Sequence, residues 1–442
     1  MIRIQNAADI EPEFFSGRIN ISGAEDIAQG IINEVRARGD AALTEYSKKF
    51  DMTTPAAFEI AAADIQAAAQ KLKAQNPKLY DALCYSRDLA LRFAQKQKES
   101  FTDFEVELEP GIITGQKTLA IERAGVYVPA GRFPLLSTVV MTVMPAVAAG
   151  VKEIIMCTPP RKHPSGNEAL PYADEGILAA ASLCGATRVF AAGGAQAIAA
   201  LAYGTQSIPK VDVIVGPGNK FVAAAKKIVY GAVGIDMVAG PTEVFIIADG
   251  SAHPAWIAAD MLAQAEHDVI AQAVLATPDK ALAEQVAAAI ERQLAELPTR
   301  QTAEASINDT SRIIITQSLE EAADIANRKA PEHLELALQD GIERDKIESL
   351  VQNYGSLFIG HGSAEVFGDY AAGLNHTLPT SGSARYTGGL SVRVFLKTVT
   401  TLKTAAGKSG YVKSAKAAGV LGDAEGLAGH ARAARIRLEV SV

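Results

Sequence analysis

From about residue 121 onward, short apolar runs alternate with longer segments that carry apolar residues at helical spacing. The apolar runs have the length and β-branched content of buried strands. Strands that are apolar throughout and separated by single helices predict parallel sheets covered on both faces. We therefore expect an α/β fold of two tandem Rossmann-like doubly wound parallel-sheet domains, with small N- and C-terminal helical extensions. The runs of the first series are AGVYVPAG, KEIIMCTPP, TRVFAAGG and VDVIVGPG, and those of the second are EVFIIADG, AVLATPD, RIIITQS, LELAL and GSLFIG.

Outside these two series the pattern changes. Residues 24–100 predict mostly helix, and we expect these helices to pack with the second series. After residue 360 the chain becomes rich in Gly, Ser and Thr, and a polar loop of this length is usually functional or mobile. The tail from residue 391 predicts helix. The expected domains are an N-terminal extension (1–23), a first α/β domain (24–123 plus 244–390), a second α/β domain (124–243) and a C-terminal helical tail (391–442).

Composition narrows the class of protein. With 48% hydrophobic and 21% charged residues among 442, the chain is typical of a globular protein. Its net charge of −8 disfavours nucleic-acid binding, because phosphate backbones attract clusters of Lys and Arg. Three cysteines without a CxxC pair indicate a reducing compartment. The N-terminus carries no secretory signal, and Pro, Gly and Gln interrupt the uncharged stretches 133–151 and 189–209. We therefore expect a cytoplasmic protein that does not bind membranes.

Two glycine-bearing turns stand between a predicted strand and a predicted helix, VGPGNK at 215–220 and AAGGAQAI at 191–198. At such turns backbone N–H groups can meet an anion. Most turns of this kind contain Gly for geometric reasons, so they do not identify a cofactor by themselves. The GKS triplet at 407–409 is not a P-loop, because Leu402 stands where the first glycine is required.

Several polar residues lie together near predicted loops. Gln264 and His267 stand three apart on a predicted helix and face one side, so they could hold one metal ion. His267 alone would more often be structural. Asp369 and His376 lie in the Gly-rich loop, where polar side chains are not needed for packing.

The segments APEHLEL and EGLAGH add two further Glu–His pairs. Glu332 and His333 are adjacent, so they can converge on one substrate only at a turn. Glu425 and His430 are separated by a segment with two glycines. Taken together, these His, Asp, Glu and Gln residues favour a metal ion beside an acid–base pair.

These segments resemble the histidinol dehydrogenase family, and the resemblance covers roughly residues 24–442. It implies a zinc-dependent, homodimeric dehydrogenase that oxidises L-histidinol through the aldehyde to L-histidine. That oxidation removes four electrons, so it consumes two NAD. The motifs that carry the resemblance occur in the family's order: ERAGVYVPAG, GGAQAIAALAYGT, VDVIVGPGNKFVAAAKK, IDMVAGPTEV, LAQAEHD, APEHLEL, GDYAAGLNHTLPT and EGLAGH.

The resemblance also implies roles for individual residues. It makes Glu332 and His333 the catalytic pair, and it places the metal and the catalysis in the first α/β domain and NAD in the second. The C-terminal tail is expected to reach the partner's active site in the dimer. The implied zinc ligands are Gln264, His267, Asp369 and His430; the NAD contacts are Tyr127, Gln196 and Asn219; the substrate contacts are Thr242, Gln264, His267, His333, Asp369, His376, Glu425 and His430.

Some features favour other chemistry. Thr242 replaces the Ser that the family often has, and the segment SARYTGGLSVRVFLKTVT is similar to paralogues that oxidise other polar or sulfonated alcohols. Arg385 or Arg393 could pair there with a sulfonate such as that of dihydroxypropanesulfonate. Cys157 could be proposed as a nucleophile, but nothing near it in sequence would lower its pKa. A non-catalytic binding relative would not need the Glu332–His333 pair.

Overall fold

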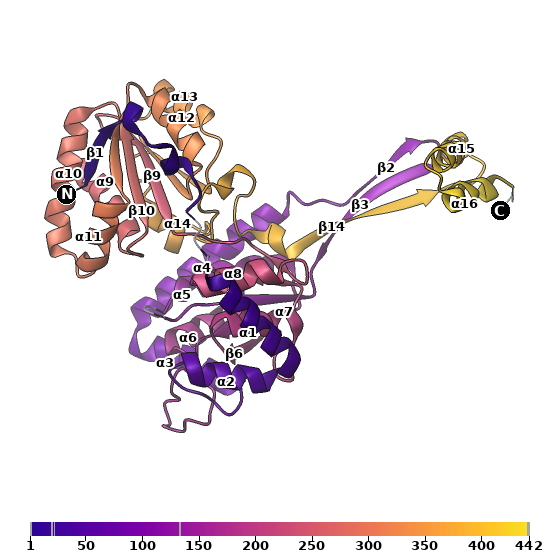
Figure 1. Cartoon of the computed structure of the whole chain (residues 1–442), viewed down its shortest axis with the longest axis horizontal. Helices are drawn as coiled ribbons and strands as arrows, with labels where there is room; N and C mark the ends of the chain where they lie inside the picture. The colour runs from indigo at the N-terminus through magenta and orange to yellow at the C-terminus, as the bar shows by residue number, and fades with distance from the viewer. Residues whose placement is uncertain (1, 19–20, 22, 132–133, 440–442) are drawn as a thin grey trace. The chain divides into compact units, whose positions relative to one another are not determined.

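The computed structural model describes residues 2–18, 21, 23–131 and 134–439. The chain forms two compact units (Figure 1). The larger unit contains Met1–Gln95 and Ile121–Phe395, and the smaller contains Lys96–Ala120 and Leu396–Val442.

The first predicted series forms a five-stranded parallel sheet in the larger unit. Its strand order is β6-β5-β4-β7-β8, so the first strand in sequence is central and the order reverses between β4 and β7. All four expected strands and the helices between them are confirmed, and a short fifth strand completes the sheet. The elements are β4 (Arg123–Tyr127), α5 (Leu136–Ala149), β5 (Glu153–Thr158), α6 (Glu175–Cys184), β6 (Arg188–Ala191), α7 (Gly194–Tyr203), β7 (Val213–Val215), α8 (Lys220–Val229) and β8 (Gly234–Ile235).

The second series forms a six-stranded parallel sheet with the order β1-β11-β10-β9-β12-β13. Apart from β1 (Arg3–Asn6), which extends one edge, this order repeats that of the first sheet. The two Rossmann-like sheets are therefore confirmed. The elements are β9 (Glu243–Ala248), α9 (Pro254–Ala265), β10 (Gln272–Thr277), α10 (Lys280–Glu296), α11 (Arg300–Asp309), β11 (Arg312–Ile315), α12 (Leu319–Lys329), β12 (His333–Ala337), α13 (Ile342–Leu350), β13 (Ser356–Ile359) and α14 (Glu365–Tyr370).

The expected helices of residues 24–100 are present, but their packing corrects the expected domain grouping. They are α1 (Ala24–Arg38), α2 (Asp40–Phe50), α3 (Ala62–Gln75) and α4 (Pro77–Lys98). Ile31, Ile32 and Val35 of α1 share one apolar core with α7 and α8 of the five-stranded sheet, and α3 packs on α6. Residues 24–75 therefore belong with 123–235 and not with 244–390. Helical spacing identifies an apolar face, but not the surface that covers it.

The smaller unit corrects the prediction that the tail from residue 391 is helical throughout. An antiparallel sheet of order β14-β3-β2 precedes two helices, and it also takes in residues 104–120, which were expected in the first α/β domain. Its strands lack a continuous apolar run and are largely exposed, which explains why no strand was predicted there. The elements are β2 (Phe104–Glu109), β3 (Ile112–Ala120), β14 (Leu396–Thr404), α15 (Ser409–Ala424) and α16 (Ala428–Glu439).

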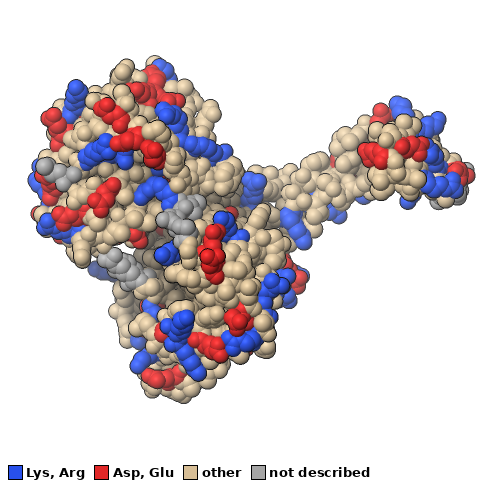
Figure 2. Space-filling model, viewed as in Figure 1, with Lys and Arg blue, Asp and Glu red and all other residues tan. Residues whose placement is uncertain are grey.

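The distribution of surface charge and the lengths of the apolar helices are relevant to binding of nucleic acids and membranes. On the face of the larger unit that Figure 2 presents, acidic and basic side chains are interspersed. Among the helices that the structure describes, none is long and apolar enough to cross a membrane. The uncharged stretches at 133–151 and 189–209 contain α5 and α7, which are mostly buried in the larger unit.

Candidate active site

The predicted catalytic residues lie at the amino edge of the six-stranded sheet. Strands β9 and β12 are parallel neighbours, with His333 opposite Val244, so their first residues stand side by side. Helix α12 is followed by its C-cap residue Ala330, whose φ of +52° is left-handed, and then by Pro331. Glu332 then lies in a bend directly before the strand. This bend is the turn that adjacent residues need in order to converge, and Glu332 Oε2 lies 3.7 Å from His333 Nδ1.

The start of β9 holds both side chains through hydrogen bonds. Glu332 Oε2 accepts from Thr242 Oγ1 at 2.5 Å and from the Glu243 backbone N–H at 3.0 Å. His333 Nδ1 lies 3.2 Å from the Glu243 carbonyl oxygen. Because a carbonyl only accepts, Nδ1 carries the hydrogen and Nε2 is the basic nitrogen of the neutral ring. Nε2 lies 3.4 Å from Asp369 Oδ1.

Burial and neighbouring charges shift the pKa values of this pair. Burial raises the pKa of Glu332 to about 7. Burial by itself lowers the pKa of His333, but the charges of Glu332, Asp369 and Glu365 outweigh it and hold that pKa well above its ordinary value. Burial raises the pKa of Asp369, but the hydrogen bond and charge of His333 hold it below its ordinary value. Near neutral pH, Asp369 is therefore ionised and Glu332 is close to its midpoint.

Helices α9 and α14 supply the other polar groups around the pair. Glu365 and Asp369 stand four apart on α14, so they share one face. Gln264, on α9, is buried, and its amide nitrogen donates to Thr242 Oγ1 at 2.6 Å, which leaves the hydroxyl hydrogen of Thr242 for Glu332. His376 is half-buried, and desolvation lowers the pKa of its ring.

Most of the expected substrate and metal residues therefore meet in the larger unit. His267 is exposed and lies in a bend two residues beyond the end of α9, so the expectation that it shares a helix with Gln264 is wrong, but it is still close enough to Asp369 to lower the pKa of that carboxyl. Glu425 and His430 are exposed residues of the smaller unit, at the end of α15 and in α16. The larger unit by itself supplies three of the four expected metal ligands.

The chemistry of these three donors fits a zinc ion. Asp369 offers an ionised carboxylate, His267 an imidazole and Gln264 an amide, and zinc accepts nitrogen and oxygen ligands. Among the described residues, no three His, Cys, Asp or Glu are arranged to hold a metal ion.

Three buried acids at this site escaped the sequence analysis. Glu243, Glu335 and Glu365 are at most 5% exposed. Glu335 follows His333 by two positions, so it lies on the same face of β12, and its Oε1 accepts from the Glu365 backbone N–H at 2.9 Å. An acid in the apolar run LELAL was a usable signal for Glu335, and the i, i+4 spacing from Asp369 was one for Glu365.

The expected cofactor residues lie at the carboxyl edge of the five-stranded sheet, where the strand order reverses. Tyr127 ends β4 and is buried, and its hydroxyl accepts from the Gly194 N–H, at the start of α7, at 3.1 Å. After β7, Gly216 has φ +114°, and a Cβ there would lie 2.1 Å from the Tyr127 carbonyl oxygen. Two glycine turns at helix N-termini therefore lie at this edge of the sheet, the kind of place where α/β proteins bind anions.

The other two expected NAD contacts stand on the same two helices. Gln196 is buried in the first turn of α7. Asn219 caps α8, because its side-chain oxygen accepts from the N–H groups of Phe221 and Val222 at 3.0 and 3.2 Å. The two predicted strand–turn–helix junctions are therefore present, and both lie at the carboxyl edge of the five-stranded sheet.

The residues of the competing hypotheses lie elsewhere. Cys157 is fully buried in β5, and burial raises the pKa of its thiol, as in a structural cysteine. Arg385 is exposed and donates to the Arg328 carbonyl oxygen, and Arg393 is exposed as well.

A Rossmann-like sheet with two glycine turns, joined in one chain to a second sheet with a buried Glu–His pair, is typical of an enzyme of the dehydrogenase class. Comparison with known proteins identifies the family. A family model described as histidinol dehydrogenase matches residues 16–438. The chain belongs to the histidinol dehydrogenase family.

Individual relatives agree with this assignment. Histidinol dehydrogenases of Dechloromonas aromatica and Thermus thermophilus are 43% and 46% identical over 420 and 413 residues. These matches cover 94% and 93% of this chain, and 93% and 94% of the relatives. The crystal structure of histidinol dehydrogenase from Elizabethkingia anophelis is similar with a TM-score of 0.89 and 34% identity, over 99% of this chain and 98% of that one.

Proposed function

We propose that this enzyme is a histidinol dehydrogenase that oxidises L-histidinol through L-histidinal to L-histidine, with two NAD and a zinc ion. Family membership supports the reaction, and one observation carries the assignment of roles. That observation is the buried pair of Glu332 and His333, held in a defined orientation by the start of β9.

His333 is the base of the alcohol oxidation. Its Nδ1–H donates to the Glu243 carbonyl oxygen, which directs Nε2 toward the site to take the hydroxyl proton. NAD, when bound, accepts the hydride in each of the two oxidations. His333 acts as a base only when its ring is neutral. Because Asp369 helps to raise the pKa of His333, a cation bound to Asp369 would lower that pKa, and a larger fraction of the His333 rings would then be neutral near neutral pH.

Glu332 is the base of the aldehyde oxidation. It takes a proton from water as the water adds to the aldehyde, and His333 takes the hydroxyl proton of the resulting hydrate. A pKa of about 7, set by burial, suits this role, since the carboxylate is then basic enough to take the proton and sufficiently ionised near neutral pH.

The zinc ion would be held by Gln264, His267 and Asp369 together with His430. When bound, it supplies a template that grips the imidazole and amine of the substrate. Thr242 and His376 are further substrate contacts beside the reacting carbon. Glu425 is the substrate contact that the C-terminal tail contributes. The assignment of Tyr127, Gln196 and Asn219 to NAD rests on their position around the two glycine turns.

A dimer with exchanged tails would bring Glu425 and His430 to a site. The smaller unit exposes large apolar side chains, which a partner chain would cover: Phe104, Val106, Leu108, Leu402, Val420 and Leu421. We place the enzyme in the cytoplasm, because its three cysteines are free thiols.

Subunit complementation tests the exchanged tail. Inactive Glu332→Ala and His430→Ala chains, unfolded and refolded together, form mixed dimers in which one site collects both changes and the other collects neither. With random pairing half of the dimers are mixed, so about a quarter of normal activity returns. A mixture that contains heterodimers but is no more active than its parents refutes the shared site.

The direct test of the function measures NADH formation with L-histidinol and, separately, with dihydroxypropanesulfonate. We expect turnover with histidinol and two NADH for each histidine formed. Preference for the sulfonate would replace this proposal with the alternative of a same-family dehydrogenase that oxidises sulfonated alcohols. Thr242 and the segment around Arg385 and Arg393 are the features that suggest this alternative. The exposed positions of both arginines favour histidinol.

A further inference from the structure

Both catalytic side chains depend on the backbone of one residue, Glu243. Its N–H donates to Glu332 Oε2 at 3.0 Å, and its carbonyl oxygen lies 3.2 Å from His333 Nδ1. The first residue of β9 thus orients a carboxylate with one main-chain group and an imidazole with the other. Any rotation of this backbone moves both members of the pair.

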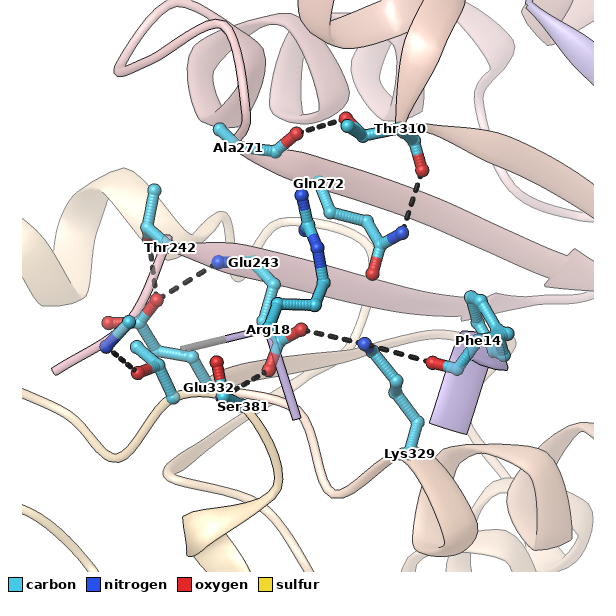
Figure 3. A network of polar contacts seen from close by, with 12 residues as sticks. Phe14, Arg18, Thr242, Glu243, Ala271, Gln272, Thr310, Lys329, Glu332 and Ser381 are labelled. Atoms are coloured by element: carbon cyan, nitrogen blue, oxygen red, sulfur yellow. Dashed lines mark hydrogen bonds and ion pairs between the residues drawn. The ribbon is translucent and has the colours of Figure 1, made fainter. Parts of the chain in front are cut away.

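The Glu243 side chain is anchored in the protein interior. Its Oε1 accepts from the Ser381 N–H at 3.0 Å, and its Oε2 lies 3.0 Å from Lys329 Nζ (Figure 3). Lys329, the last residue of α12, also donates to the Phe14 carbonyl oxygen at 3.2 Å. The side chains of Glu243 and Lys329 are each only 2% exposed. A strand, a helix and a loop therefore meet at one carboxylate.

Such an ion pair is a costly way to fill space. Removing two charges from water carries a desolvation penalty, and apolar residues of similar volume are often equally stabilising. An apolar pair, however, has no directional contacts with which to fix the backbone of Glu243. The arrangement is therefore better explained by orientation than by stability.

We propose that the Lys329–Glu243 ion pair positions the catalytic pair by fixing the Glu243 backbone. Lys329 and Glu243 are positioning residues, since their side chains act through Glu332 and His333. This inference rests on the proposed function and adds two residues to the machinery of that site.

Lys329→Met tests the proposal by leaving the Glu243 carboxylate buried without its partner. Because a displacement of about 1 Å at reacting groups costs about 100-fold in rate, we expect kcat to fall about 10- to 100-fold. The KM values for histidinol and NAD should change by less than about twofold, since no substrate contact is removed. Lys329→Met combined with Glu243→Gln removes both charges of the ion pair and keeps an acceptor for Ser381, although Arg18 then loses the neighbouring charge of Glu243. This double variant should regain about half or more of the loss on a logarithmic scale.

Gln272→Leu is the matched control. Gln272 is buried opposite Glu243 on β10 and donates to the Thr310 carbonyl oxygen at 2.7 Å, without contacting the catalytic pair (Figure 3). It should lower the melting temperature and leave kcat unchanged. If it lowers kcat as much as Lys329→Met does, the effect is general destabilisation and the proposal is wrong.

Two more outcomes are decisive. If Lys329→Met does not fold, Glu243→Gln alone tests the proposal, because it weakens the ion pair and should lower kcat about tenfold. Lys329→Arg keeps the positive charge at this position and should therefore keep most of the rate. Unchanged kcat in Glu243→Gln refutes the positioning role. A wild-type enzyme that forms no NADH with histidinol refutes the proposed function instead, so the two failures are distinguishable.

Discussion

The two parallel sheets share one strand order but carry their functional groups at opposite edges. In the five-stranded sheet the glycine turns lie at the carboxyl edge, one after β6 and one after β7. In the six-stranded sheet Glu332 and His333 lie at the amino edge, between β9 and β12. The residues that we propose for NAD thus lie at the carboxyl edge of one sheet, and the proposed acid–base pair lies at the amino edge of the other.

Helix dipoles give this difference a physical meaning. The carboxyl edge of a parallel sheet is where the following helices begin, and helix N-termini attract anions. The amino edge is where the preceding helices end, and their partial negative charge favours imidazolium and disfavours carboxylate. That field acts in the same direction as the raised pKa values of Glu332 and His333, for which burial and the neighbouring carboxylates are the main causes. Each edge therefore suits the chemistry placed there.

The largest effect is expected at the amino edge. His333→Asn removes the base of both oxidations while its amide can still donate to the Glu243 carbonyl oxygen. We expect kcat to fall about 1,000-fold with histidinol and with histidinal, as general base catalysis contributes about 100- to 10,000-fold. Steady-state kinetics with each substrate measures this, and NAD binding should be unchanged. Equal losses of NAD affinity and of rate would show that the two edges are not separate in function.

Glu332→Gln should separate the two oxidations. The amide oxygen can still accept from Thr242 and from the Glu243 N–H, but it cannot take a proton from water. We expect about a 100-fold loss in histidinal oxidation and a much smaller loss in histidinol oxidation. In the wild type, the aldehyde step should slow as the pH falls below about 7, because Glu332 becomes protonated there. Single-turnover assays that find both steps slowed equally would contradict this division of roles.

Substitutions that loosen the Gly216 turn at the carboxyl edge should weaken the binding of NAD and leave the binding of histidinol unchanged. Lys226 donates to the Gly216 carbonyl oxygen at 2.9 Å and pairs with Asp236, whose Oδ2 accepts from the Gly216 N–H at 2.8 Å. Lys226→Met combined with Asp236→Asn removes this clamp without leaving a lone charge. We expect the KM for NAD to rise about tenfold, equivalent to about 1.4 kcal/mol, with the KM for histidinol unchanged.

Its control is the neighbouring Lys227→Met, which removes only the exposed ion pair with Glu25. That variant should leave both KM values unchanged, since exposed ion pairs contribute little. If the double variant has the wild-type KM for NAD, the Gly216 turn does not contribute to cofactor binding and this prediction is wrong.

The smallest effect concerns stability. Burial raises the pKa of Glu335 to about 8, whereas the unfolded chain releases this proton near pH 4.5. Between these values the folded state binds more protons, so Glu335 makes stability fall as the pH rises. Glu335→Gln should therefore gain at least about 1 kcal/mol relative to the wild type between about pH 5 and about pH 9. Denaturant unfolding measures this, with Glu343→Gln on the exposed α13 as a control that should show no gain.

Burial determines which strands and helix contacts could be predicted from the sequence. The fully buried strands of both sheets were predictable, because continuous apolar runs leave few alternatives. The exposed strands β2, β3 and β14 were not, and neither was the partner of α1, whose apolar face is visible in sequence while its covering surface is not. At the site, the need for a turn at Glu332–His333 followed from spacing alone. The roles of Glu243 and Lys329 did not, since they depend on a contact between residues far apart in sequence.

The pairing of β3 with β14 has a consequence for how the chain is made. Leu396 lies opposite Ala120, 276 positions later in the chain. At about 5–20 residues per second, a ribosome needs about 15–55 s to cover that interval. During this time β3 presents an unpaired edge where β14 will later bind. This sheet is therefore among the last parts of the molecule to complete its pairing.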